Sequence, residues 1–193
     1  MGETLYMKIK HIIFGILLGI AILTTGCNSV GKSNKETESK IENSAKEVMI
    51  KDIEKELEDS IYRKATDEEA KNIFGGDLFY PQYLPDRFSK HGVFLSDNIK
   101  ELPMVKIVWF DYEKKEMLMI TMGKADATEP NKEEEIVFTD KLEIPGKISD
   151  MYSWAEFCTY YKFVQNGVKA QSYMLVNDEN NRDAYNKILK SFK

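Results

Sequence analysis

The stretch FCTYYKFVQNGVKAQSYMLV, from Phe157 to Val176, places two runs of strand-forming residues on either side of Asn166-Gly167. Asn-Gly is the preferred pair for a two-residue turn in which both residues adopt positive φ. Such a turn fixes the register of the strands that it joins. The stretch therefore predicts a β-hairpin with four pairs on its inner face: Phe163 with Ala170, Tyr161 with Ser172, Thr159 with Met174 and Phe157 with Val176. The other face should carry Tyr160 opposite Tyr173, with Cys158, Lys162 and Gln171 alongside.

Further strand patterns fill the chain from Gly92 to this hairpin. Met104–Tyr112 and Glu116–Met122 flank Glu113-Lys-Lys115 and carry apolar residues on both faces, which predicts a central hairpin covered on both sides. Residues 136–144 alternate between apolar and polar side chains, and this period of two predicts a strand with one face in the core. The C-terminal half of the chain is therefore expected to form an antiparallel sheet.

Helices are expected before and after these strands. In the first, Met49, Ile53, Leu57 and Ile61 follow one another at intervals of four residues, so an amphipathic helix of about 20 residues should start near Ala45. Its polar face mixes acidic and basic residues. This mixture favours packing on the core or docking to a partner over lying on an anionic membrane surface.

The second helix should start at the capping box Thr66-x-x-Glu69 and stop at Gly75-Gly76. The next stretch, Phe79–Phe88, contains two prolines, which exclude a helix and predict an extended lead into the sheet. Asn177–Asn181 is suited to start a last helix. Its apolar stripe should pack on the sheet and consists of Tyr185, Ile188, Leu189 and Phe192.

The N-terminal segment sets the compartment. Lys8 and Lys10 precede an unbroken run of twelve apolar residues and glycines, residues 12–23. A basic start and a short apolar run indicate a signal peptide, because a membrane-spanning helix needs roughly 20 apolar residues. An uncleaved signal anchor is the alternative, and Met7 is an alternative start to Met1.

Thr24, Thr25 and Gly26 follow the apolar run and lead to Cys27. This end of the segment resembles the lipobox of bacterial lipoproteins, with Thr24 where leucine is usual. The resemblance implies that the chain is cut between Gly26 and Cys27 and that Cys27 carries a diacylglyceryl group. The protein would then sit on the outer side of the cell membrane, held by acyl chains, which anchor stably when there are two of them.

Asn28–Ser44 has almost no apolar residues and is expected to be a disordered tether. The chain thus divides into a signal peptide at residues 1–26, a lipidated cysteine and tether at residues 27–44, and a single α+β domain at residues 45–193. After lipidation of Cys27, Cys158 is the remaining cysteine. No internal disulfide can then form, so the stability of the domain must come from packing.

Three parts of the domain carry a second resemblance: Pro81-x-Tyr83-Leu84-Pro85-x-x-Phe88, the aromatic hairpin with Asn166-Gly167, and Ala184-Tyr-x-x-Ile-Leu-x-Ser191. Together they resemble a family of uncharacterised extracytoplasmic domains of Gram-positive lipoproteins and anti-sigma factors. That family is distantly similar to the half-barrels of lipoprotein carriers and envelope-stress sensors. The resemblance spans residues 78–192 and implies a curved, half-barrel-like antiparallel sheet, with an N-terminal helix and a C-terminal helix packed on it. It carries over no catalytic residues.

Few residues suggest chemistry. His91 is the one histidine after Cys27, and no serine or cysteine near it lies in a nucleophile motif. Met117, Met119 and Met122 suggest copper(I), but residues 119 and 122 of one strand lie on opposite faces. We therefore expect no catalytic residue, no metal and no cofactor. The formal net charge of −5 gives no reason to expect nucleic acid.

These patterns favour a non-enzymatic binding or sensing lipoprotein, with an envelope protein as a possible partner. The alternative is a carrier of a lipid or other apolar ligand, which would need an apolar cavity in place of a filled core. Large rings are abundant on the expected strands, and some of them should line a concave face if the sheet is curved. The candidate ligand-facing residues are Trp109, Phe110, Trp154, Phe157, Tyr161 and Phe163.

Overall fold

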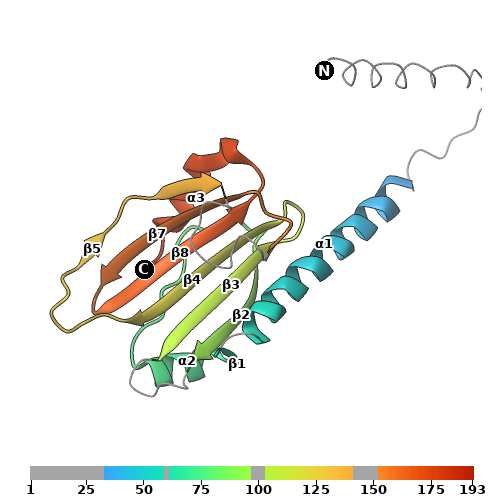
Figure 1. Cartoon of the computed structure of the whole chain (residues 1–193). Helices are drawn as coiled ribbons and strands as arrows, with labels where there is room; N and C mark the ends of the chain where they lie inside the picture. Colours follow the sequence, from blue (N-terminus) through green and yellow to red (C-terminus); the bar gives the residue numbers. More distant parts are fainter. Residues whose placement is uncertain (1–32, 59–60, 97–102, 141–151) are drawn as a thin grey trace, which may run out of the picture. The chain divides into compact units, whose positions relative to one another are not determined.

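A computed structural model shows the fold of the chain (Figure 1). It describes the backbone of residues 33–58, 61–96, 103–140 and 152–193; within the first helix, side chains are described for residues 43–57. Residues Glu36–Lys193 form one compact unit, which contains the sheet and the helices that pack on it.

Within the described residues, eight antiparallel strands form one open sheet in the order β1-β2-β3-β4-β8-β7-β5, and β6 also pairs with β7 (Figure 1). The predicted α+β class and antiparallel sheet are confirmed. The strands are β1 Arg63–Ala65, β2 Ser89–Ser96, β3 Met104–Asp111, β4 Glu116–Lys124, β5 Lys132–Glu133, β6 Val137–Asp140, β7 Phe157–Gln165 and β8 Val168–Val176.

The hairpin β7–β8 has the predicted register. Phe157, Thr159, Tyr161 and Phe163 face the expected partners on β8, and Tyr160 faces Tyr173. At the turn, φ is +52° for Asn166 and +74° for Gly167, as the Asn-Gly pair predicts. The predicted central hairpin is also confirmed, with Asp111 opposite Glu116 where β3 turns into β4. Its residues are buried on both faces.

Helix α1, Ser33–Glu58, differs from the prediction at both ends. It includes residues 33–44, which the composition assigns to the tether. These residues are rich in Glu and Lys, which are good helix formers even without an apolar face. The helix ends at Glu58, so Ile61 lies beyond it and is 43% exposed. The rest of the predicted stripe holds, because Met49 and Ile53 are fully buried.

Helix α2, Asp67–Phe74, has the predicted ends: the Thr66 side chain accepts a hydrogen bond from the Glu69 amide, and Gly75 has a φ of +70°. After the short 3-10 turn η3, Glu179–Asn181, helix α3 spans Arg182–Leu189. Phe192 lies beyond α3, although it is buried as expected.

The proline-containing stretch 79–88 pairs with the end of the chain. The amide of Tyr80 donates to the carbonyl of Lys193 at 3.2 Å, and the amide of Gln82 donates to that of Ser191 at 2.9 Å. Pro81 lies opposite Phe192 in an isolated bridge. The stretch forms no helix, as predicted, but it is extended only in part, because the chain bends at residues 82–83 and the Phe88 amide donates to the Pro85 carbonyl in a turn. Its backbone partner is the C-terminus, a long-range pairing that no local pattern indicates.

The sheet packs on both faces. The inner face, which carries Trp109, Leu118, Tyr161 and Met174, forms the larger cluster with α2, α3 and residues 78–88. The outer face, which carries Phe110, Met119 and Leu175, packs against Met49 and Ile53 of α1 and against Tyr152 and Ala155. Buried Cys158 belongs to this second cluster. The second face of the β7–β8 hairpin is therefore partly covered by protein.

The predicted strand at residues 136–144 is confirmed for the part that the structure describes. Strand β6 covers Val137–Asp140, Ile136 precedes it, and Leu142 and Ile144 lie outside the described residues. Among the residues that the structure describes, no helix is long and apolar enough to cross a membrane.

Candidate functional site

The six predicted ligand-facing residues do not share one surface. Trp109, Tyr161 and Phe163 are buried in the inner-face cluster, and Phe110 is buried in the outer-face cluster. Phe157 and Trp154 are partly buried beside the inner and the outer cluster respectively. The rings contact other rings: Tyr161 stacks on Phe163 with centroids 5.2 Å apart, and Trp109 meets the edge of Phe192 at 6.1 Å.

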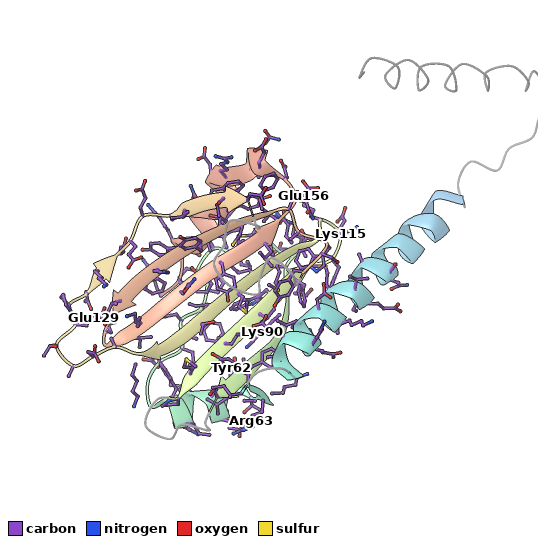
Figure 2. The ribbon with its side chains drawn as sticks, in the orientation of Figure 1. Tyr62, Arg63, Lys90, Lys115, Glu129 and Glu156 are labelled. Carbon is purple, nitrogen blue, oxygen red and sulfur yellow. The ribbon has the colours of Figure 1, made fainter. Side chains whose placement is uncertain are left out.

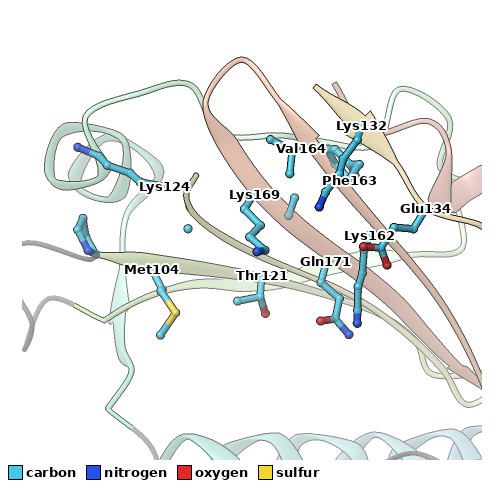
Figure 3. A pocket seen from close by; sticks show the side chains of 13 residues that line it. Met104, Thr121, Lys124, Lys132, Glu134, Lys162, Phe163, Val164, Lys169 and Gln171 are labelled. Carbon is cyan, nitrogen blue, oxygen red and sulfur yellow. The ribbon is translucent and has the colours of Figure 1, made fainter. Parts of the chain in front are cut away.

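A pocket of about 400 Å³ lies on the part of the sheet away from this packing, and Phe163 is the one predicted residue that borders it. We call it the outer-face pocket (Figure 3). Its lining residues come mainly from β3, β4, β7 and β8: Pro103, Met104, Thr121, Gly123, Lys124, Lys132, Glu134, Lys162, Phe163, Val164, Lys169, Ala170 and Gln171.

Two rows of residues cross the strands beneath this pocket. In the first row, Gln171 of β8 lies between Lys162 of β7 and Thr121 of β4. In the second row, Lys169 of β8 lies between Val164 and Gly123. Residues two apart on a strand share a face, so both rows belong to the outer face. Figure 3 shows the side chains of the first row pointing to the same side of the sheet.

The second row is apolar apart from its lysine. Val164 is 2% exposed, and Gly123 leaves the floor of the pocket without a side chain. Met104 lies next to this position, since a Cβ added to Gly123 would be 3.8 Å from its Cγ. The pocket thus has a polar row and an apolar row side by side.

Lysines dominate the charge of the pocket, because four lysines and one glutamate line it. Lys132 and Lys169 both approach Glu129, at 3.1 Å and 3.8 Å. The Lys162 ammonium lies over the ring of Tyr160, 5.5 Å from its centroid, and has no carboxylate within 4.0 Å among the described residues. Lys124 points away, with its Nζ close to Gly75.

A buried lysine marks the border between the pocket and the part of the outer face that α1 covers. Lys106 of β3 lies opposite Thr121, and its Nζ binds Glu56 of α1, which also accepts from the hydroxyl of Tyr152. The same Nζ lies 4.6 Å from the ring centroid of Tyr62. Burial, reinforced by the Glu56 charge, raises the pKa of Tyr62 to about 12. This cluster holds α1 on the sheet next to the pocket.

The two ends of the sheet differ in their charged side chains. Figure 2 shows Lys115, on the β3–β4 turn, and Glu129, near the pocket, at opposite ends of the strands. At the β3–β4 end, Arg87 donates to Asp111 at 2.5 Å and to Glu116 at 2.6 Å. Both carboxylates are buried, and Tyr185 also donates to Glu116 at 3.0 Å. Because every member of this network has a protein partner, we assign it to stability.

The side chains that could act in catalysis or bind a metal are packed against other residues of the fold. His91 is half-buried against Phe94 and Phe110, and burial lowers its pKa, with a smaller contribution from Lys64. Burial raises the pKa of the Cys158 thiol to about 12, which disfavours the reactive thiolate. Met117 and Met119 are core residues on one face, with Met122 on the other. In the described part of the chain, no group of three or more His, Cys, Asp or Glu residues is placed to hold a metal ion.

Comparison of the chain with models of known protein families and with curated proteins gives no match. The candidate site is therefore defined by its geometry alone. Sequence reasoning placed Lys162 and Gln171 together on the second face of the hairpin, but it assigned no role to them. Their position beside Thr121 and Gly123 depends on the pairing of β4 with β8, which joins strands far apart in the chain.

Proposed function

We propose that this chain is a lipid-anchored, non-enzymatic binding or sensing protein on the outer side of the cell membrane, and that the outer-face pocket is its binding site. The observation that carries the proposal is the uneven cover of the outer face. Helix α1 and Tyr152 cover one end, whereas the other end is hollowed and lined by side chains from several strands. A concave site of a few hundred cubic ångströms with a few placed polar groups is typical of small-ligand binding.

The membrane anchor in this proposal rests on the sequence. The basic start, the short apolar run and Cys27 lie outside the described residues, and their pattern supports export and lipidation. A lipid on Cys27 would keep the binding domain near the membrane and raise its local concentration there.

A carrier of an apolar ligand is the second candidate, and the apolar row of the pocket favours it. A half-barrel carrier of the kind that the sequence suggests would hold its ligand against the core rings of a curved sheet. Those rings contact one another, which supports a ligand at the outer-face pocket over a ligand inside the core. A half-barrel-like curvature of the sheet remains part of the proposal.

Native mass spectrometry of the full protein, extracted from its own membrane, tests the proposal. Gly123→Ile should fill the floor of the pocket with little strain, because a Cβ there meets no atom closer than 3.8 Å. We expect a ligand-bound mass for the wild type that is missing for Gly123→Ile. Val137→Ile, on an exposed strand position, is the control and should keep the bound mass. A wild type with no bound mass in any preparation would contradict the proposal.

A further inference from the structure

We propose that the outer-face pocket selects a small organic anion that has an apolar body, and that Lys162 and Lys169 bind its acidic group. The inference rests on the proposed function and adds the chemical class of the ligand. It differs from the sequence-based expectation of a lipid or other apolar ligand in an apolar cavity.

The charge around the pocket favours a ligand with an acidic group. The chain as a whole has a formal net charge of −5, yet the pocket lining includes Lys132, Lys162 and Lys169 against one glutamate, apart from Lys124, whose Nζ lies near Gly75. Lys132 and Lys169 share the single carboxylate of Glu129, and Lys162 has no carboxylate partner among the described residues. An incoming carboxylate, sulfonate or phosphate would satisfy these ammonium groups with charge-assisted hydrogen bonds.

The positions of these lysines indicate where the acidic group would bind. Lys162 and Lys169 come from neighbouring strands, one in the polar row and one in the apolar row. An acidic group between them can also reach Gln171 and Thr121 in the polar row, whose side chains point to the same side (Figure 3). Amide and hydroxyl groups of this kind orient a ligand in a binding pocket.

The apolar row indicates that the ligand also has an apolar body. Val164, Met104 and the open floor at Gly123 lie beside the lysines, and they would contact an aliphatic or aromatic body attached to the acidic group. The volume of about 400 Å³ suits a ligand of drug-like size. An extended acidic polymer would need basic residues in a line across an open surface, whereas here the lysines surround an apolar hollow.

A pair of dyes that differ in one group tests the inference. Anilinonaphthalene sulfonate carries a sulfonate that phenylnaphthylamine lacks, and both fluoresce more strongly in apolar surroundings. The full protein is placed in phosphatidylcholine nanodiscs, and the signal of empty nanodiscs is subtracted. We expect the sulfonate dye to bind saturably with a Kd roughly tenfold or more below that of its uncharged parent, as one charge-assisted contact provides.

Two lysine pairs separate a local contact from the net charge. Lys162→Gln with Lys169→Gln should raise the Kd of the sulfonate dye by roughly tenfold and leave that of phenylnaphthylamine unchanged. Lys51→Gln with Lys114→Gln removes the same charge from exposed positions outside the pocket and should change neither. Gly123→Ile should abolish binding of both dyes. All of these variants alter surface or open positions, and their melting temperatures are measured first.

The outcomes of these measurements distinguish the anion inference from the proposed binding function. Equal affinity for both dyes, with binding lost in Gly123→Ile, would overturn the anion inference and leave the binding function in place. The same loss of affinity in both lysine pairs would also overturn it, because the effect would then come from net charge. If no dye binds and native mass spectrometry shows no bound species, both proposals fall.

Discussion

Arg87 is the residue on which the buried charges of this fold depend. Its guanidinium is about one-third exposed and bridges Asp111 and Glu116, whose side chains are 1% and 2% exposed. Asp111 also accepts the amides of Glu113 and Lys114 at 3.1 Å, which fixes the β3–β4 turn. Burial of two carboxylates is tolerated because one cation and several donors face them.

Replacing Arg87 should therefore be costly. Arg87→Met leaves two buried carboxylates without their cation, and we expect the free energy of unfolding to fall by about 3 kcal/mol. Chemical denaturation of the full protein measures the loss. Lys71→Met, which breaks the exposed ion pair with Asp77, is the control and should cost far less, because solvent screens an exposed pair. Equal effects of the two substitutions would mean that the Arg87 network does not hold the fold.

His91 gives the fold a defined response to acid. Its pKa is lower in the folded state than the ordinary 6.5, first because of burial and then because of Lys64, with Glu54 of α1 acting in the opposite direction. The unfolded chain thus takes up a proton first as the pH falls through 6.5, so the contribution of His91 to stability decreases as the pH falls below about 7. His91→Phe should show a smaller fall in melting temperature over this range. An identical fall in both proteins would exclude His91 as a cause.

The β7–β8 hairpin is the element whose turn and register are most fully determined by its own sequence. Its turn needs positive φ at both residues, and its register places alternate residues on two buried faces. The hairpin pairs with β4 through residues 168–175 of β8, so it also determines which side chains of β4 and β8 meet in the pocket. An error at the turn would shift both clusters and the pocket rows together.

Gly167→Val tests the turn. Gly167 has a φ of +74° and nothing within 4 Å of an added Cβ, so the cost should come from the backbone alone, at about 1 kcal/mol or more. Thermal unfolding measures it. Gly123→Val is a matched control, because Gly123 has no positive φ and a Cβ there makes an ordinary contact. An unchanged melting temperature in Gly167→Val would contradict the turn.

At the scale of the whole molecule, local signals in the sequence were sufficient for several elements. Thr66, Gly75 and the Asn166-Gly167 pair act on their immediate neighbours, and the structure confirms each of them. The pairing of Pro81 with Phe192 and the extension of α1 to Ser33 were missed, because the first is long-range and the second lacks an apolar stripe. The pocket could not be predicted, since it depends on how far α1 covers the outer face.

The proposed lipid anchor on Cys27 can be tested by substitution. Cys27→Ser should abolish lipid attachment and leave the precursor uncut, because a hydroxyl is a far poorer nucleophile than a thiolate. Metabolic labelling with a fatty acid, followed by gel analysis of the full protein, measures both effects. Cys158→Ser is the control and should keep the label. Label that persists in Cys27→Ser would contradict the lipoprotein hypothesis.

Methionine-methyl NMR of the full protein in nanodiscs tests directly where a ligand binds. Met104 borders the outer-face pocket, whereas Met119 and Met174 are buried in the outer and inner clusters. On addition of anilinonaphthalene sulfonate, we expect a saturable shift of the Met104 methyl and no comparable shift of Met174. A shift of Met174 with Met104 unchanged would place the ligand among the core rings and contradict binding at the outer-face pocket.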